Sequence, residues 1–103
     1  MIVLPKEAPR RRTVSDEDLT RLVDTHGYSG ALLRSVREAR DIQLQDMADS
    51  TRISVRYLEA IEADRFDTLP SATFVRGYVR EMARMLKLDD HAMVDGYMRR
   101  YPK

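Results

Sequence analysis

Apolar residues recur along most of the chain at the spacing of three and four residues that places them on one face of a helix. The pattern predicts six helices, over residues 15–26, 29–40, 44–50, 55–63, 71–87 and 90–101. Within the second of these, Arg34, Arg37 and Glu38 fall opposite the apolar residues, which predicts an ordinary solvent-exposed charged face. The pattern therefore predicts an all-α protein.

Residues that commonly begin or end helices fall at the predicted boundaries. Ser15 and Ser54 precede the first and fourth helices, Gly27 follows the first, and Pro70 with Ser71 opens the fifth. The third and fourth helices are brief and joined by a short turn, which is a helix-turn-helix pattern. Local sequence and periodicity thus agree on where the helices lie.

The composition removes several functional classes. A length of 103 residues corresponds to one small domain, which leaves little room for an elaborate active-site cleft. The chain has no cysteine for a disulfide or a thiolate metal site, its two histidines (His26 and His91) stand alone, and it has no glycine-rich phosphate loop. We therefore expect neither an enzyme nor a protein that binds a metal or cofactor.

Residues 1–13 show no apolar periodicity, so we expect a flexible arm ahead of a helical domain over residues 14–103. The run from Arg10 to Arg12 favours either a solvated tail or contact with phosphates or anionic lipid. The longest apolar run is far shorter than the roughly 20 residues that cross a bilayer, and the N-terminus lacks the pattern of a secretory signal. We expect a cytoplasmic domain.

The fourth predicted helix is the element that would read DNA in a helix-turn-helix protein. A projection at about 100° per residue buries Tyr57, Leu58 and Ile61. It turns six residues outward: Val55, Arg56, Glu59, Ala60, Glu62 and Ala63. Val55 and Arg56 could contact base edges, but Glu59 and Glu62 would stand among the phosphates. Because residues 29–70 also carry six basic and eight acidic side chains, a net charge of −2, the pattern disfavours DNA binding.

The predicted helix over residues 71–87 carries more apolar surface than one packing contact requires. Its apolar side chains cover about half of the helical cylinder, whereas a surface helix needs a stripe only somewhat above 100° wide. Phe74 and Tyr78 lie on one shoulder of this stripe, with Gly77 beside Phe74. Either two neighbouring helices cover the whole stripe, or this shoulder contacts another protein. The pattern alone leaves both interpretations open.

Residues 32–89 resemble the N-terminal cytoplasmic domain of the RodZ family of bacterial cell-shape proteins. Two stretches carry the resemblance, RISVRYLEAIEADRFDTLP over residues 52–70 and TFVRGYVREMARML over residues 73–86. The second combines an aromatic residue, the triplet RGY and a later alanine, which recur together in that family. This combination is more specific than helix-turn-helix similarity by itself.

The resemblance implies a compact five-helix bundle built on a phage-repressor-like helix-turn-helix, with residues 15–26 as one extra short helix. It also implies binding to MreB, an actin-like filament protein, instead of DNA. The family's aromatic contact residues correspond to Phe74 and Tyr78, and Arg76 and Arg80 are further candidates for contact with an acidic filament surface. The alternative function is a DNA-binding transcription regulator that uses Val55 and Arg56.

The chain departs from the family pattern in two respects. It has Asp41 and Gln43 where members usually have a glycine and then a serine cap, so the local turn is expected to differ. Full RodZ proteins also continue into a basic segment, a membrane-spanning helix and an outer domain. We therefore expect either a cytoplasmic piece of an inner-membrane-tethered protein or a free-standing relative with a different polarity or cytoskeletal partner.

Overall fold

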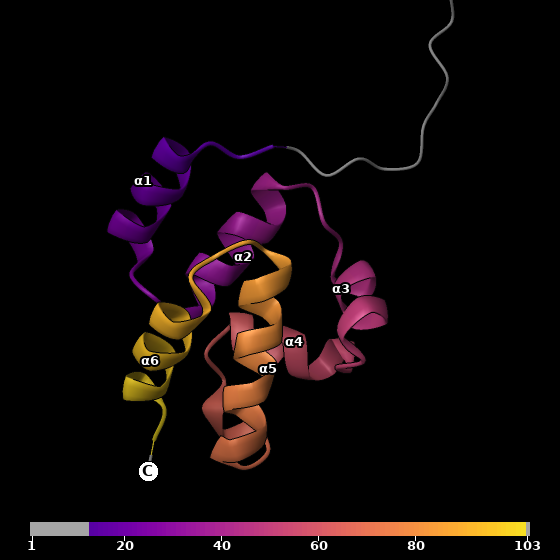
Figure 1. The fold of residues 1–103 in the computed structure, drawn as a ribbon. Helices are drawn as coiled ribbons and strands as arrows, with labels where there is room; N and C mark the ends of the chain where they lie inside the picture. Colours follow the sequence, from indigo (N-terminus) through magenta and orange to yellow (C-terminus); the bar gives the residue numbers. More distant parts are fainter. Residues whose placement is uncertain (1–12, 103) are drawn as a thin grey trace, which may run out of the picture.

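The computed structural model describes residues 13–102 and consists, over that range, of helices without any strand (Figure 1). The elements in chain order are α1 (Asp16–His26), α2 (Gly30–Ala39), α3 (Leu44–Thr51), α4 (Val55–Glu62), the 3-10 helix η1 (Phe66–Thr68), α5 (Ala72–Met85) and α6 (Asp90–Arg100). Each predicted helix is present, with ends within two residues of those expected. The prediction of an all-α protein is confirmed. The predicted arm lies, except for its last residue, outside the described residues.

The helices are arranged around α2 and α5 (Figure 1). α2 packs against α1 and α4, α3 packs against α4 and α5, and α6 lies along α5. α3 and α4 form the expected helix-turn-helix, and α5 crosses in front of this unit in the view of Figure 1. One side of α5 therefore faces the bundle, and the other faces solvent.

The core is built from the apolar side chains at helical spacing. Its buried members are Leu32, Leu33, Val36, Ile42, Met47, Ile53, Leu58, Ile61, Val75, Val79, Met82, Ala83, Leu86, Met93, Val94 and Tyr97. Phe66 of η1 packs against this core and contacts the Tyr97 ring edge-on with the centroids 5.7 Å apart. α1 has no fully buried residue and rests on the core through half-buried side chains.

At the start of several helices, a side chain accepts a hydrogen bond from a backbone N–H group of the first turn, which has no partner within the helix. The Ser15 hydroxyl accepts a hydrogen bond from the Asp18 N–H at 3.1 Å, and the Ser54 hydroxyl accepts one from the Tyr57 N–H at 3.3 Å. Each such cap stabilises a helix by about 1 kcal/mol. Gly27 ends α1 with a φ of 67°, a left-handed conformation that glycine adopts without steric cost.

The turn between α2 and α3 forms without the glycine of the family pattern. Asp41 takes the left-handed conformation with a φ of 60°. Aspartate adopts this conformation more readily than most residues. The Gln43 N–H then donates to Asp46 Oδ2 at 3.2 Å, which satisfies one backbone donor at the start of α3. Asp41 and Gln43 thus form the turn that ends α2 and starts α3, in place of the glycine and serine of the family pattern.

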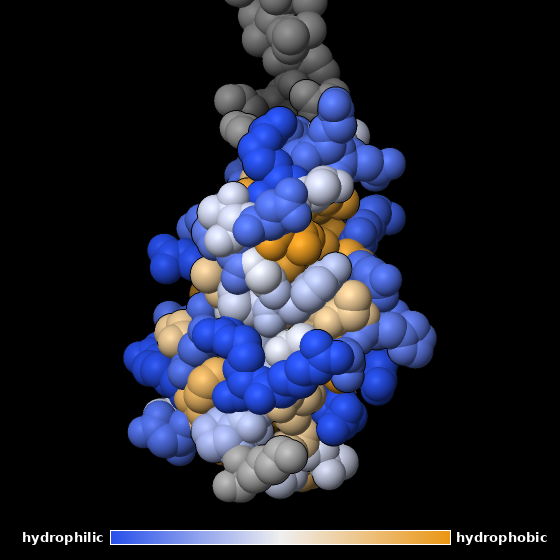
Figure 2. Space-filling view, turned by 90° about the vertical axis from the view of Figure 1, so that its left-hand side faces the viewer, coloured by the Kyte–Doolittle hydropathy of each residue, from blue (hydrophilic) through white to orange (hydrophobic). Residues whose placement is uncertain are grey.

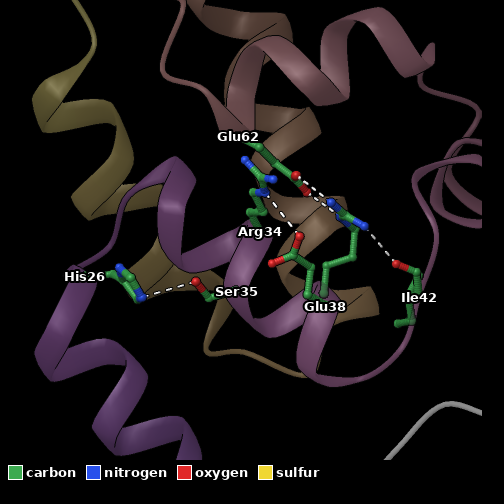
Figure 3. Close-up of polar contacts among 7 residues, drawn as sticks. His26, Arg34, Ser35, Glu38, Ile42 and Glu62 are labelled. Atoms are coloured by element: carbon green, nitrogen blue, oxygen red, sulfur yellow. Dashed lines mark hydrogen bonds and ion pairs between the residues drawn. The ribbon is translucent and has the colours of Figure 1, made fainter.

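A buried ion pair joins α2 to α4 (Figure 3). Arg37 Nε and Nη2 donate to Glu62 Oε2 and Oε1 at 2.8 and 3.0 Å, and Arg37 Nη1 donates to the Ile42 carbonyl oxygen at 2.9 Å. The two side chains are only 10% and 5% exposed. The prediction that Arg37 and Glu62 face solvent is therefore wrong.

The position of each residue beside the core explains its burial. Arg37 follows the buried Leu33 by four residues, and Glu62 follows the buried Leu58 by four. A side chain at that spacing emerges only about 40° round the helix from the core residue. Because α2 and α4 pack together there, both side chains are covered. Ala60 was also expected outward and is 3% exposed, since neighbouring elements cover more of α4 than the projection allows.

Loss of one partner from this pair should destabilise the fold strongly. Removing one member of a buried pair leaves an uncompensated charge, which costs about 3–5 kcal/mol. We expect Glu62→Ala to lower the free energy of unfolding by that amount, measured by urea denaturation with far-UV circular dichroism. The double variant Arg37→Met/Glu62→Leu removes both charges and should be more stable than Glu62→Ala.

The exposed pair between Arg34 and Glu38 provides the matched control (Figure 3). Its atoms are 3.2 Å apart, but the two side chains are 63% and 56% exposed. Glu38→Ala should therefore change the unfolding free energy by less than about 1 kcal/mol. Equal losses in Glu38→Ala and Glu62→Ala would contradict a dominant role for the buried pair.

Candidate functional site

Phe74 on α5 is the exposed large hydrophobic residue among the described residues, with 59% of its surface accessible. Its neighbours on the apolar stripe of α5, Val75 and Val79, are completely buried. Tyr78 lies between these extremes and is half-buried. The bundle thus covers most of the stripe and leaves the shoulder at Phe74 uncovered.

Three aromatic rings from two helices form a continuous row at this shoulder. Tyr78 stacks on Tyr57 of α4 with centroids 5.8 Å apart and ring planes at 24°. Phe74 follows, with its centroid 6.3 Å from that of Tyr78 and a tilt of 36°. We call Tyr57, Tyr78 and Phe74 the aromatic row. Stacked rings such as those of Tyr57 and Tyr78 attract by about 0.5–1.5 kcal/mol, so this contact stabilises the position of the Tyr78 ring.

Arg56 extends the aromatic row on α4. Its guanidinium carbon lies 5.9 Å from the centroid of the Tyr57 ring, within range of a cation–π interaction. Tyr57 was expected in the buried arc of α4, but it is half-buried, and its ring lies between Arg56 and Tyr78. The helical projection placed Phe74 and Tyr78 on one shoulder of their helix but could not show the contact with Tyr57, because that contact joins residues on different helices.

The candidate DNA-contacting residues lie at the start of α4. Arg56 is exposed and Val55 is half-buried. Of the two carboxylates expected to repel DNA, Glu59 is exposed and Glu62 is buried against Arg37. The solvent-facing part of α4 therefore offers one arginine beside one glutamate, and the arginine lies over a tyrosine ring.

Arg76 and Arg80 lie on the other flank of α5, away from the aromatic row. They line a shallow hollow of about 370 Å³ between α5 and α6, together with His91, Ala92, Val94 and Asp95. Within residues 13–102, neither guanidinium forms an ion pair with a carboxylate. Asp95 instead pairs with Arg99 at 2.7 Å. Among residues 13–102, therefore, this flank carries two arginines without an ion-pair partner.

Other arginines of α5 and α6 are used within the fold. Arg84 Nε donates to Asp90 Oδ2 at 2.9 Å, and this hydrogen bond lowers the pKa of the Asp90 carboxyl. Arg100 pairs with Asp64 at 3.0 Å. Arg76 and Arg80 thus differ from these arginines in having no such role among the described residues.

The side of the molecule formed by α1 and α6 has a different character. Figure 2 shows a mostly hydrophilic surface there, with apolar area confined to a compact zone in the upper half and smaller spots below. His26 of α1 is half-buried, and its Nε2 lies 3.1 Å from the Ser35 hydroxyl of α2, a contact that the sequence did not indicate (Figure 3). His91 is exposed.

No helix among the described residues is both long and apolar enough to cross a membrane. Residues 13–102 also contain no group of three or more His, Asp or Glu side chains placed to hold a metal ion.

A family model described as a helix-turn-helix domain matches residues 32–93, from α2 into the first turn of α6. The chain belongs to this helix-turn-helix family. α1 lies outside the matched residues.

The cytoskeleton protein RodZ of Streptococcus pneumoniae (strain ATCC BAA-255 / R6) is 37% identical to the chain over 68 residues, which cover 66% of this chain and 25% of that protein. The domain is therefore RodZ-like, as its sequence predicted, and the chain spans about a quarter of the length of this relative. No solved structure matches the chain.

Proposed function

We propose that the chain is a non-enzymatic, cytoplasmic protein-binding adaptor that docks an actin-like filament protein of the MreB type through α5. The observation that carries the proposal is the exposure of Phe74 (59%) at the end of an aromatic row whose other two rings stack on each other. The RodZ-like sequence supports a cytoskeletal partner. In this proposal α2 to α6 form the repressor-like five-helix bundle, and α1 is an addition to it.

Free energy favours covering Phe74. Full burial of a phenylalanine side chain stabilises a protein by about 1.5–3 kcal/mol, so a ring left 59% exposed forgoes a large part of this contribution. A partner that covers the ring recovers it. Because Tyr78 is already stacked on Tyr57, little side-chain entropy is lost when the aromatic row is covered. Phe74 and Tyr78 are the proposed anchors of the interface.

Arg76 and Arg80 are proposed to recognise acidic side chains of the same partner. Unpaired cations attract an acidic surface over several ångströms, which raises the association rate and fixes the orientation of the partner. The other cation near the aromatic row, Arg56, is a further contact in this proposal. A single exposed arginine beside Glu59 on α4 does not support DNA reading, since nucleic-acid binding requires several cations along the phosphates.

Truncation of Phe74 should remove filament binding without harming the fold. We expect Phe74→Ala to weaken binding to purified MreB filaments by about 30-fold or more, the loss typical of an interface hot spot. Co-sedimentation of the chain with filaments measures the effect. Because the Phe74 side chain is exposed in the fold, the melting temperature of the Phe74→Ala variant should stay close to that of the unmodified chain. Tyr78→Ala should also weaken binding, with a small loss of stability from the missing stack on Tyr57.

Unchanged co-sedimentation of a folded Phe74→Ala variant would sink the proposed function. A mobility-shift experiment with DNA fragments near 50 mM salt tests the alternative. A shift that Arg56→Ala abolishes and that disappears at higher salt would favour DNA binding instead.

The charges on α5 should control how fast the partner associates. We expect Arg76→Glu/Arg80→Glu to slow association with MreB by about tenfold at low salt, with a smaller effect at high salt. Stopped-flow or surface-based kinetics give the rate constant. Arg21→Glu/Arg34→Glu is the matched control, because it reverses the same number of charges at two exposed arginines of α1 and α2 outside the hollow. If both variants slow association equally, the effect comes from net charge and Arg76 and Arg80 have no specific role.

A further inference from the structure

The chain has four glycines, and the fold explains three of them. Gly27 ends α1 in a left-handed conformation. A Cβ atom on Gly30 would overlap the Ile61 carbonyl oxygen, so this glycine lets the start of α2 approach the end of α4. A Cβ atom on Gly96 of α6 would lie 2.5 Å from the Tyr28 Cβ atom, a distance that real Cβ atoms do not reach. Each of these positions is occupied by glycine for a reason inside the molecule.

Gly77 has no such reason. It lies in the interior of α5 with an ordinary helical conformation, and a Cβ atom there would have no neighbour within 4 Å among the described residues. Glycine in the interior of a helix costs about 1 kcal/mol relative to alanine. Gly77 therefore lowers the stability of α5 at a position where the described structure has room for the methyl group of alanine.

Gly77 lies midway between the two groups of candidate contacts on α5. At about 100° per residue, it is about 60° round the helix from Phe74 on one side and about 60° from Arg80 on the other. Tyr78 and Arg76 are its neighbours in the chain. A partner that contacts the aromatic row and the unpaired arginines at the same time must pass over Gly77.

We infer that the main chain of the filament protein crosses α5 directly over Gly77, with an apolar side chain against Phe74 and Tyr78 and a carboxylate against Arg76 and Arg80. This inference rests on the proposed function and adds the place and the chemistry of the contact. The partner is an acidic surface because both arginines lack a carboxylate partner among residues 13–102. It is also partly apolar because it covers Phe74.

The absence of a side chain at Gly77 sets the distance of approach. Glycine allows another backbone to come close to a helix, and a single methyl group there would hold the partner away from the rings and the arginines. Contact energies between atoms decline steeply when a gap of 0.5–1 Å opens, so small displacements remove much of the attraction. Gly77→Ala should therefore separate stability from binding.

The test compares Gly77→Ala, Phe74→Ala and Thr20→Ala in co-sedimentation with purified MreB filaments and in thermal unfolding. We expect Gly77→Ala to raise the free energy of unfolding by up to about 1 kcal/mol and yet to weaken filament binding at least tenfold. Thr20→Ala is the control for helix stabilisation alone, because Thr20 is an exposed residue within α1, outside the proposed contact. It should leave binding unchanged.

The outcomes distinguish this inference from the proposed function. Lost binding in Phe74→Ala with full binding in Gly77→Ala overturns the inference and leaves the proposed function standing. A less stable Gly77→Ala variant also overturns it, because the glycine would then serve the fold. If the unmodified chain does not bind MreB, or if Phe74→Ala binds normally, the proposed function fails and the inference fails with it.

A second copy of the chain is the other possible occupant of this face. Analytical ultracentrifugation of the chain alone detects it. Self-association that Gly77→Ala abolishes, with filament binding retained, would assign the glycine to a homodimer contact and overturn the inference.

Discussion

The buried pair between Arg37 and Glu62 is the constraint on which the rest of the structure depends. Two charges out of contact with water are stable only when they meet with good geometry, and here the guanidinium makes three hydrogen bonds, two to the carboxylate and one to the Ile42 carbonyl oxygen. A rotation or slide of α4 against α2 would leave an unpaired buried charge. The pair therefore selects one arrangement of the helix-turn-helix, which an apolar contact alone would define less sharply.

The position of α4 then determines what α5 presents to solvent. Tyr57 projects from α4 beneath Tyr78, and Arg40 Nε of α2 donates to the Leu86 carbonyl oxygen at 2.9 Å, which fixes the far end of α5. The Tyr97 hydroxyl of α6 donates to the Ile61 carbonyl oxygen at 3.1 Å, and its burial raises the pKa of that hydroxyl. These polar contacts join α5 and α6 to the helix-turn-helix, and the ring of Phe74 lies on the side of α5 that this packing leaves exposed.

Local features were predictable from the sequence, whereas features that depend on packing between helices were not. Caps such as Ser15 and Ser54 act on their own helix, so the helix ends were found within two residues. A single-helix projection cannot show that α2 and α4 meet at Arg37, and it also cannot decide whether Phe74 is covered. A signal was present all the same: opposite charges four residues after Leu33 and Leu58 mark positions that can pair beside a core.

The inward turn of Glu62 also bears on how a helix-turn-helix domain can serve a role other than DNA reading. Recognition of the DNA major groove requires free polar groups on the second helix of the helix-turn-helix. Here the Glu62 carboxylate of α4 is paired with Arg37, and the exposed Arg56 of α4 lies over the Tyr57 ring. In the proposed function α4 becomes internal support for the aromatic row, and recognition moves to α5, where the exposed ring of Phe74 is not needed to hold the fold. Such a division places the contact surface on one helix and the buried ion pair that orients the scaffold on two others.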